Sequence, residues 1–578
     1  MSASNVGLPV RSAAKGAATY WVDVLLFAGL AALVAGTVGL ARRWAAPLRP
    51  TVVIDLSIGA LPVYTLLSLA RGVTAYVLSL LFTLVFATTA AHSRRAERLM
   101  IPVLDILQGI PVLGFLPGLV LGMVALFPHS NVGLELACVI MIFTGQAWNM
   151  TFSLYGSLRS IPTELREVAQ VHRFGWWKRF RSLEVPSGMI GLVWNSMMSM
   201  AGGWFFLTVN EAFTLGDRDF RLPGVGAYMS VAIDQGNRGA MAGGIVAMMT
   251  MIIAVDQLVW RPALAWAQKF KLEETSATEA PTSWVLTLLR RSRLLVWLER
   301  LRSLPAQPEG SGTVVGGTHD LIESTAARLL VRGLGWLAGV GGIVVVLWGA
   351  VHLLSLLSAV GAREWLQLAA ALTLTLLRTA SALLLGALWT VPVGIWIGLS
   401  ARRARLVQPV IQVMAAFPAP MLFPLVTLAM LSMGVNFAWG CVLLMLLGSQ
   451  WYILFNVLAG ASAMPHDLRE AAAIYGLKGW TRWRTLYLPA IFPQLLTGLI
   501  TAAGGAWNAS IVAEYVRYRG RTLIAPGLGS LITEATGAAN FPLLAAGVLT
   551  MSLALVTLNR TVWRRLYRLA DERFSLNR

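Results

Sequence analysis

Two charged segments interrupt this apolar chain, and their side chains are the ones best suited to bind a partner. The segment at 468–489 reads LREAAAIYGLKGWTRWRTLYLP, and the segment at 165–186 reads LREVAQVHRFGWWKRFRSLEVP. The charged residues of the first are Arg469, Glu470, Lys478, Arg482 and Arg484. Such groups form ion pairs and hydrogen bonds with lipid headgroups or with another protein.

Residue patterns for catalysis and for metal or cofactor binding are absent from the sequence. It contains no G-x-x-x-x-G-K-[ST] phosphate-binding loop, no H-E-x-x-H zinc motif and no G-x-S-x-G nucleophile motif. The six histidines are scattered, and Cys138 and Cys441 both lie inside apolar runs. We expect no enzyme activity, no catalytic residue, no metal ion and no cofactor in this chain.

The composition is typical of an integral membrane protein. Of the 578 residues, 57% are hydrophobic and only 13% are charged, and the mean hydropathy is +0.68. The net charge of +19 could indicate a nucleic-acid partner, but the basic residues cluster in short loops between apolar runs. That distribution is typical of a multi-pass protein with positive loops inside, so we expect no nucleic acid.

The apolar runs predict an all-α fold of about twelve membrane-spanning helices, because one span needs roughly 20 apolar residues. The predicted spans are 21–40, 64–91, 107–127, 132–154, 187–209 and 238–260, then 334–358, 371–399, 415–433, 436–459, 490–513 and 540–560. Most loops rich in Arg and Lys fall on one side if both termini are cytoplasmic. Two basic loops, 41–50 and 515–521, fall on the other side.

The chain is an internal duplication. An offset of 303 residues pairs the two charged segments and continues through the following helix and loop, for example from Pro186 to Pro489 and from Glu211 to Glu514. Upstream the offset becomes 307, as in the pair Arg71 and Arg378. Because each copy has an even number of spans, the copies are parallel repeats. Such repeats can pack about an axis along the membrane normal and enclose a pathway, although a duplication without a central path is the alternative.

The repeat divides the chain into domains. We predict a cytoplasmic N-terminus at 1–20, a first membrane domain at 21–260, a linker at 261–333, a second membrane domain at 334–565 and a cytoplasmic tail at 566–578. Within the linker, 283–304 has apolar residues at helical spacing and five arginines, so it either lies flat on the membrane or packs as a cytoplasmic helix. The Pro- and Gly-rich stretch 305–320 is typical of a flexible tether.

Each charged segment predicts a short amphipathic helix on the cytoplasmic side. In the second copy, Pro465 can begin the helix, and Gly476 ends or bends it. The residues alone leave two interpretations open, a connector that contacts only lipid headgroups and a docking element for another protein.

The stretch EAAAIYGLKGWTRWRTLYLP resembles the E-A-A-x-x-x-G-x9-hydrophobic-x-L-P loop of ABC-importer permeases. The residues that match are Glu470, Ala471, Ala472, Gly476, Leu486, Leu488 and Pro489. The resemblance covers 21–260 and 334–565 and is greatest to the nitrate, sulfonate, taurine and bicarbonate branch, in the form with two permease domains fused. It implies two tandem six-helix permease domains and a pathway for a small solute, which we expect to be an anion.

In such permeases the loop is a coupling helix that sits in a groove of a separate ATPase, which binds the ATP. The resemblance therefore implies that the ATPase is contacted by Arg469, Glu470, Ala471, Ala472 and Gly476 in copy two and by Arg166, Glu167, Ala169, Arg173 and Gly175 in copy one. Copy one departs from the pattern, because Val168 replaces an alanine and Arg173 stands where copy two has Gly476. We expect Gly175 to provide the turn there.

Polar and amphipathic residues in or near spans are candidates for the pathway, because buried polar groups in a bilayer tend to face a cavity or the bundle interior. They are Arg71, Asn149, Trp204, Asn210, Glu211, Arg378, Trp451, Trp507, Asn508 and Glu514. Trp204 and Trp507 either form a bulky gate or pack between helices. Arg71 and Arg378 either attract anions at the outer mouth or extend to the interface.

We therefore expect the transmembrane permease subunit of an ATP-driven importer in a bacterial inner membrane. Its expected partners are a cytoplasmic ATPase dimer, an external solute-binding protein, lipids and a small solute. The alternatives are a secondary transporter driven by an ion gradient, which the sparse acidic residues in the spans disfavour, and a membrane-bound enzyme or scaffold.

Overall fold

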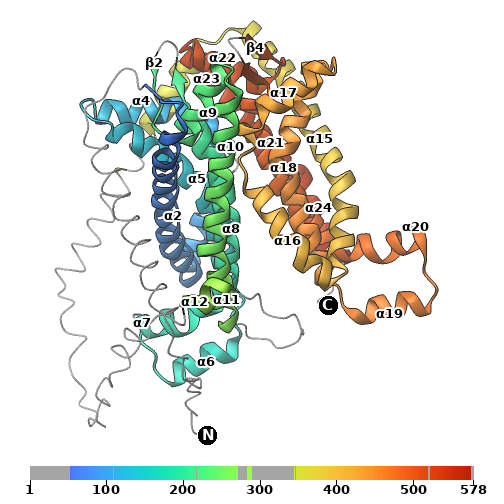
Figure 1. Ribbon diagram of the computed structural model, residues 1–578. Helices are drawn as coiled ribbons and strands as arrows, with labels where there is room; N and C mark the ends of the chain where they lie inside the picture. Colours follow the sequence, from blue (N-terminus) through green and yellow to red (C-terminus); the bar gives the residue numbers. More distant parts are fainter. Residues whose placement is uncertain are drawn as a thin grey trace, which may run out of the picture. The chain divides into compact units, whose positions relative to one another are not determined.

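The computed structural model describes residues 53–108, 110–215, 218–270, 283–289, 341, 344, 347–518 and 521–574. The chain divides into two compact units. One comprises Met1–Ala35 and Ser283–Ala359, and its described helices are α12 (Trp284–Leu289) and Leu347–Ser358. The other comprises Gly36–Thr282 and Val360–Arg578 and contains the elements drawn in colour from α2 to α11 and from α15 to α24 in Figure 1. The predicted span at 21–40, the basic loop at 41–50 and the tether at 305–320 lie outside the described residues.

The first half of the larger unit begins with a long helix and ends with a helix that continues past a π-helical turn. Its elements are η1 (Ile58–Ala60), α2 (Leu61–His92), α3 (Arg94–Gln108), η2 (Val112–Phe115), α4 (Leu116–Leu126), α5 (Val132–Arg159), α6 (Thr163–Val171), α7 (Trp176–Arg179), η3 (Phe180–Glu184), α8 (Val185–Glu211), β1 (Thr214–Leu215), β2 (Arg218–Asp219), α9 (Val225–Asp234), α10 (Arg238–Val255), η4 (Asp256–Trp260), α11 (Arg261–Ala267) and η5 (Gln268–Phe270).

The second half repeats this order. Its elements are α15 (Ala362–Gly398), α16 (Ala401–Ala416), η6 (Ala419–Met421), α17 (Phe423–Ser432), α18 (Phe437–Ser462), α19 (His466–Ile474), α20 (Gly479–Arg482), η7 (Trp483–Tyr487), α21 (Leu488–Ala513), β3 (Tyr515–Tyr518), β4 (Arg521–Ile524), α22 (Leu528–Gly537), α23 (Phe541–Leu558), η8 (Asn559–Trp563) and α24 (Arg564–Phe574).

The internal duplication is confirmed in the backbone. The π-helical turns η3 and η7 lie 303 residues apart, and so do η4 and η8. In Figure 1, α6 and α19 lie at one end of the molecule, whereas β2 and β4 lie at the opposite end. The two halves therefore have the same orientation, as parallel repeats require.

Seven helices among the described residues are long and apolar enough to cross a membrane, and one bent pair brings the number to eight. The seven are Ile58–His92, Val132–Arg159, Arg238–Phe270, Ala362–Gly398, Phe437–Ser462, Gly479–Ala513 and Phe541–Ala570. The predicted span at 187–209 is present as α8, but it is not among the seven. Its sequence VPSGMIGLVWNSMMSMAGG is rich in Ser, Gly and Asn, and these residues reduce its apolar character.

The predicted spans at 107–127 and 415–433 are wrong as continuous helices. The segments Arg94–Gln108 and Val112–Leu126 meet at a bend of 84°. In the second half, α16 ends at Ala416 and α17 begins at Phe423. Pro111 and Pro418 stand immediately before η2 and η6, and a proline removes one backbone donor and clashes with the preceding turn. Each half therefore has two separate helices where one continuous span was predicted.

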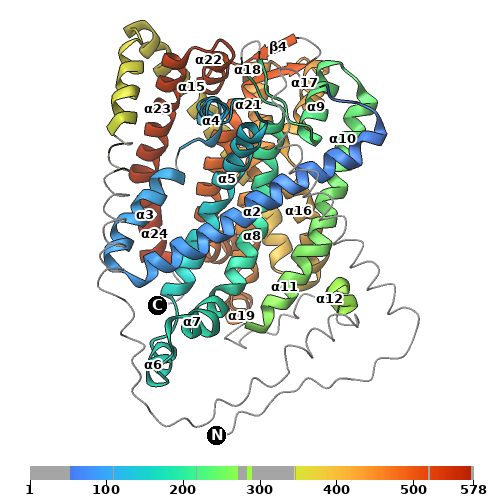
Figure 2. The ribbon, with the colours of Figure 1, turned by 90° about the vertical axis from the view of Figure 1, so that its left-hand side faces the viewer.

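The core of each half is a set of three long helices in close contact. In the first half α2 and α8 both pack on α5, and in the second half α15 and α21 both pack on α18. Figure 2 shows α2 crossing obliquely in front of α5 and α8. Small residues allow this approach. At Gly72, for example, an added Cβ would lie 2.6 Å from Cζ3 of Trp204.

Two small antiparallel hairpins add strand structure to the otherwise all-α fold. β1 pairs with β2 through Thr214 and Asp219, and β3 pairs with β4 in the register Tyr515 to Ile524. In the longer hairpin, the sequence YVRY of β3 buries Val516 and Tyr518 and exposes Arg517, as suits a strand with one buried face.

Candidate functional site

A cavity of about 960 Å³ lies between the two halves. Its wall combines residues of α3, α5 and α8 with residues of α16, α18, α21 and the segment from α23 to α24. Ten aromatic residues line it: Trp148, Phe152, Phe205, Phe206, Phe417, Trp451, Tyr452, Phe455, Trp563 and Tyr567. The ionised side chains of the wall are Asp105, Arg560 and Arg564. The cavity can therefore surround a solute with apolar surface while offering both signs of charge at its edge.

Three of the ten predicted pathway residues line this cavity: Asn149, Trp451 and Asn508. Asn149 on α5 is exposed to it. Trp451 on α18 is half-buried and meets Trp389 edge to face. The Oδ1 atom of Asn508 accepts a hydrogen bond of 2.9 Å from the backbone N–H of Val112, so α21 of one half is joined to the broken helix of the other.

A second cavity of about 770 Å³ lies at the end of the molecule that carries the hairpins. Arg221, Asp234, Arg517 and Glu534 are among its lining residues, and Arg221 Nη2 donates to Asp234 Oδ2 at 2.9 Å. Arg517, which belongs to the basic loop at 515–521, thus faces this cavity. The cavity contains equal numbers of acidic and basic side chains.

The two broken helices separate the cavities. Val112 and Ala419 line the larger cavity, whereas the nearby Leu113 and Met421 line the second. Since these residues belong to η2 and η6, the two short turns form a partition between the cavities. The partition contains residues from both halves.

A buried ion-pair network lies in the first half, around Arg71. The Nη1 atom of Arg71 donates to Glu211 Oε1 at 2.7 Å, and its Nε and Nη2 atoms donate to the Glu135 carboxylate at 2.6 and 2.7 Å. The backbone N–H of Gly226, at the start of α9, donates to Glu211 Oε2 at 2.8 Å. Ser68 Oγ also donates to Glu211. All three charged side chains are at most 2% exposed.

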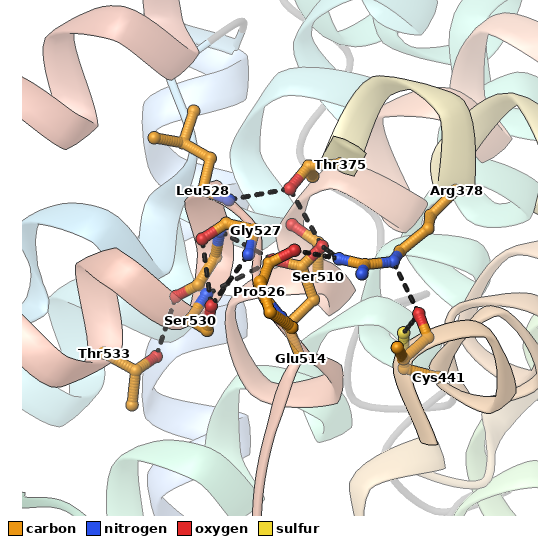
Figure 3. A network of polar contacts seen from close by, with 12 residues as sticks. Thr375, Arg378, Cys441, Ser510, Glu514, Pro526, Gly527, Leu528, Ser530 and Thr533 are labelled. Carbon is orange, nitrogen blue, oxygen red and sulfur yellow. Dashed lines mark hydrogen bonds and ion pairs between the residues drawn. The ribbon is translucent and has the colours of Figure 1, made fainter. Parts of the chain in front are cut away.

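The second half contains the same network with one carboxylate fewer (Figure 3). Arg378 Nη1 donates to Glu514 Oε1 at 2.9 Å, and Thr375 Oγ1 donates to the same oxygen at 2.8 Å. The backbone N–H of Gly529 donates to Glu514 Oε2 at 2.8 Å. Where Arg71 meets Glu135, Arg378 Nε donates to the carbonyl oxygen of Ala438. The two networks connect α2 to α8 and α9, and α15 to α21 and α22.

The Pro-Gly-x-Gly sequence before α9 and α22 permits this geometry. A Cβ at Gly527 would lie 2.3 Å from Glu514 Oε2, and a Cβ at Gly224 would lie 2.3 Å from Glu211 Oε1. Each carboxylate thus sits against the N-terminus of a helix, where free N–H groups and the helix dipole favour a negative charge.

The structure corrects the interpretation of Arg71 and Arg378. Both side chains are buried and paired, so neither extends to the interface and neither attracts anions at an outer mouth. Together with Glu211 and Glu514 they line neither of the two large cavities. Their position indicates a role in holding helices together.

Trp204, Trp507 and Asn210 also lie away from the large cavities. Trp204 and Trp507 are at most 2% exposed, which corresponds to packing between helices rather than to a gate. Trp204 borders a small space of about 30 Å³. Asn210 is buried, and neither polar atom of its amide has a hydrogen-bond partner among the described residues.

The predicted coupling helices are present as α6 and α19 outside the apolar spans. Arg166 Nη2 donates to the carbonyl of Leu158 at 2.8 Å, and Arg469 Nη1 donates to the carbonyl of Leu399 at 3.4 Å. Ala169 and Ala472 are both 4% exposed. These four residues, all expected to contact the ATPase, therefore face the rest of this chain. Ala471, next to Ala472, is half-buried.

The turn after each helix has the same form but a different residue. Gly476 has φ +66°, and Leu477 N–H donates to the Ala472 carbonyl at 2.9 Å, which closes the helix. In copy one Arg173 itself has φ +48°, and Phe174 N–H donates to the Ala169 carbonyl at 2.9 Å. The expectation that Gly175 provides this turn is wrong, because Gly175 has an extended backbone with φ −60° and ψ 161°.

Apolar residues at the tips of these helices are exposed. Ile474 is 83% exposed, Tyr475 81% and Val171 79%. Glu167 and Glu470 are also exposed, and Glu470 meets His466 at 3.1 Å. This is an unusual combination on a segment that lies outside the apolar spans, and it presents a surface to which a partner can bind.

Several residues of the site were missed from the sequence. Glu135 completes the Arg71 network, and Asp256 accepts from Gln412 across the two halves at 2.6 Å. Asp105, Arg560 and Arg564 line the large cavity. Part of the signal was available, because the offsets of 307 and 303 pair Asp105 with Gln412 and Asn559 with Asp256.

Each half of this chain is similar to a known protein family. The model for "Binding-protein-dependent transport system inner membrane component" matches residues 79–259 and again 390–575. An ABC transporter permease protein of Methanocaldococcus jannaschii is 27% identical over 198 residues, which are 33% of this chain and 71% of that protein.

Relatives with named solutes are similar over comparable lengths. The taurine transport system permease of Escherichia coli is 27% identical over 203 residues, 34% of this chain and 70% of that protein. The nitrate import permease of Synechococcus elongatus is 26% identical over 165 residues, 28% of this chain and 56% of that protein. The two family matches, one in each half, make this chain a duplicated permease: it belongs to the family of binding-protein-dependent transport system inner membrane components.

Proposed function

We propose that this chain forms the membrane pathway of an ATP-driven importer and that α6 and α19 couple it to a cytoplasmic ATPase dimer. The observation that supports coupling best is the exposure of Ile474 and Tyr475 at the tip of α19. An apolar tip beside Glu470 is expensive to leave in water but favourable in a groove of another protein. Because α6 and α19 lie at the same end of the larger unit (Figure 1), both can reach one ATPase dimer.

The two couplers bind unequally in this proposal. In α6 the tip has Val171 and the following Arg173, whereas α19 has Ile474 and the following Gly476. The basic and aromatic residues after α6 include Trp176, Trp177 and Lys178. The ATPase groove that receives α6 therefore meets a bulkier, more basic surface than the groove that receives α19.

The cavity of about 960 Å³ is the central part of the proposed pathway, and the cavity near the hairpins is its outer vestibule. A solute-binding protein delivers the solute at the vestibule. We propose a small anionic solute, because relatives are named for nitrate and taurine. The aromatic wall favours an organic anion with apolar surface over a bare inorganic ion. The proposed location is a bacterial inner membrane with both termini in the cytoplasm, because most loops rich in Arg and Lys then lie inside.

Binding of the ATPase to purified permease tests the coupling. Replacing Ile474 by Asp puts a charge into the apolar contact, and we expect at least a tenfold loss of affinity for the cognate ATPase. The matched control is Ile524→Asp, because Ile524 is also exposed but lies on the hairpin at the opposite end. Equal affinity for both variants and the parent chain would contradict the proposal.

A secondary transporter remains the competing function, and solute uptake distinguishes it. Vesicles with this chain alone and an ion gradient would accumulate solute if the competing function were correct. Vesicles that accumulate solute only with the ATPase, the binding protein and ATP support the proposed importer.

A further inference from the structure

The two halves make unequal contacts at equivalent places beside the large cavity. On one side, Gln412 Nε2 on α16 donates to Asp256 Oδ1 at 2.6 Å, and Arg261 Nε donates to Asp256 Oδ2 at 3.1 Å. These three residues are called the closed contact. Asp256 is buried, and the space beside it is only about 30 Å³.

The equivalent residues on the other side face open space. The offsets place Asp105 on α3 where α16 has Gln412, and they place Asn559 and Arg564 where the first half has Asp256 and Arg261. All three line the cavity of about 960 Å³. They are called the open triad.

The open triad contains the groups needed for the same contact. Asp105 is an exposed carboxylate that accepts one hydrogen bond within its own helix, from Gln108 Nε2 at 2.8 Å. Asn559 supplies an amide donor, and Arg564 supplies a guanidinium group. In the closed contact the acid is on the π-helical turn and the amide is on the amphipathic helix. In the open triad the acid and the amide have exchanged helices.

The surroundings of the two sites correspond as well. Trp260 and Phe455 border the small space, and their equivalents Trp563 and Phe152 line the large cavity. The same set of residue positions therefore surrounds a nearly filled space on one side and an open cavity on the other. One kind of helix contact thus exists in two states. The contact between α16 and η4 is formed, whereas the equivalent contact between α3 and η8 is not formed.

We propose that Asp105, Asn559 and Arg564 are gating residues: movement of α3 onto η8 brings Asp105 against Asn559 and Arg564 and closes the large cavity. Asn559 Nδ2 then donates to the Asp105 carboxylate, and Arg564 forms an ion pair with it across the two halves. The closed contact holds α16 in place throughout the cycle, so a single moving helix, α3, opens and closes this side. This inference rests on the proposed function only for the trigger, which is ATP binding by the ATPase.

Disulfide trapping in the full chain tests the movement. The chain keeps the open triad and the closed contact and carries cysteines beside them, either Ile106→Cys with Arg560→Cys, which line the large cavity, or, as the matched control, the equivalent pair Val413→Cys with Gln257→Cys. It is embedded in lipid discs with a hydrolysis-deficient ATPase. The control pair should cross-link to the same extent with and without MgATP. The test pair should cross-link poorly without MgATP and at least fivefold more with it. An unchanged yield of the test pair, in samples where the ATPase is bound, would overturn the proposal.

A second experiment tests the proposed ion pair between Asp105 and Arg564 and does not require a known solute. A single cysteine at Asn149, which is exposed in the cavity, reports access to a membrane-impermeant maleimide added from the ATPase side. MgATP should slow its labelling at least tenfold in the chain with native Asp105 and Arg564. Asp105→Lys should remove that effect, and the exchanged pair Asp105→Lys with Arg564→Asp should restore it. Loss without restoration would overturn the ion pair.

The two possible failures are distinguishable. Absence of ATPase from the discs, measured in the same samples, is a failure of the proposed function. ATPase that is bound while MgATP changes neither cross-linking nor labelling is a failure of the gating inference alone.

Discussion

Arg378 and Glu514 are joined by a buried ion pair of 2.9 Å between Nη1 and Oε1, and no second carboxylate among the described residues meets that arginine. In the other half, Arg71 meets both Glu211 and Glu135. The two networks are otherwise equivalent down to the helix N-terminus that receives the carboxylate. The two halves can therefore be used to compare a buried arginine that has two carboxylate partners with one that has a single carboxylate partner.

Neutralising the shared carboxylate should be more costly in the second half. Glu514→Gln leaves Arg378 as a buried charge without its carboxylate, which we expect to cost about 3 kcal/mol. Glu211→Gln leaves Arg71 paired with Glu135, so its cost should be smaller. The midpoint of thermal unfolding in detergent measures the difference. Equal midpoints for the two variants would show that Glu135 does not compensate.

A methyl group at Gly527 should disrupt the same network. Gly527→Ala places a Cβ 2.3 Å from Glu514 Oε2, so the carboxylate or α22 has to move, at a cost of about 2 kcal/mol. Gly156→Ala is the control, because a Cβ at Gly156 in α5 meets nothing within 4 Å. The control should leave the unfolding midpoint unchanged or raise it. A stable Gly527→Ala variant would indicate that the carboxylate is not held against the helix N-terminus.

The turn after α6 should tighten when glycine replaces Arg173. A left-handed backbone costs a non-glycine residue about 1 kcal/mol, and Arg173→Gly removes that cost at φ +48°. Hydrogen exchange of the Phe174 amide, which donates to Ala169, should slow by roughly fivefold. Gly476→Arg should do the reverse for the Leu477 amide in copy two. Exchange that is insensitive to both changes would contradict the assigned turn geometry.

Reversing the charge of Glu470 should weaken assembly with the ATPase while the membrane part stays folded. The Glu470 side chain is exposed and meets only His466 within the described chain, so Glu470→Lys removes no buried contact. We expect about a tenfold loss of affinity for the ATPase and an unchanged unfolding midpoint. The affinity is measured by titrating labelled ATPase onto discs. Unchanged affinity would count against the role of α19 as a coupler.

The repeat and the general positions of most helices could be predicted from the sequence. The length of an apolar run and the presence of a duplicated motif can both be read from short stretches of the chain. The breaks before Val112 and Phe423 could have been found as well, since Pro111 and Pro418 are visible in the sequence. We predicted continuous spans there from hydropathy alone, because the segments on both sides of each proline are apolar. Length and composition alone do not distinguish a continuous span from a bent one.

The roles of the polar residues could not be predicted in the same way. Arg71 and Trp204 were pathway candidates because they are polar or amphipathic residues in spans and are paired in the repeat, yet both are packed inside one half. Pairing in the repeat shows that two residues have the same place, not whether that place faces a cavity. The unequal use of Asp256 and Asp105 is a property of the assembled helices, and it appears only when both halves are seen together.

ATP-driven uptake is the measurement that tests the central claim most directly. Proteoliposomes contain this chain with its cognate ATPase and solute-binding protein, and radiolabelled nitrate, taurine and an aromatic sulfonate are supplied outside. We expect at least one organic anion to accumulate with internal MgATP and accumulation to be lost when the ATPase cannot hydrolyse ATP. Accumulation that persists with the inactive ATPase would contradict it.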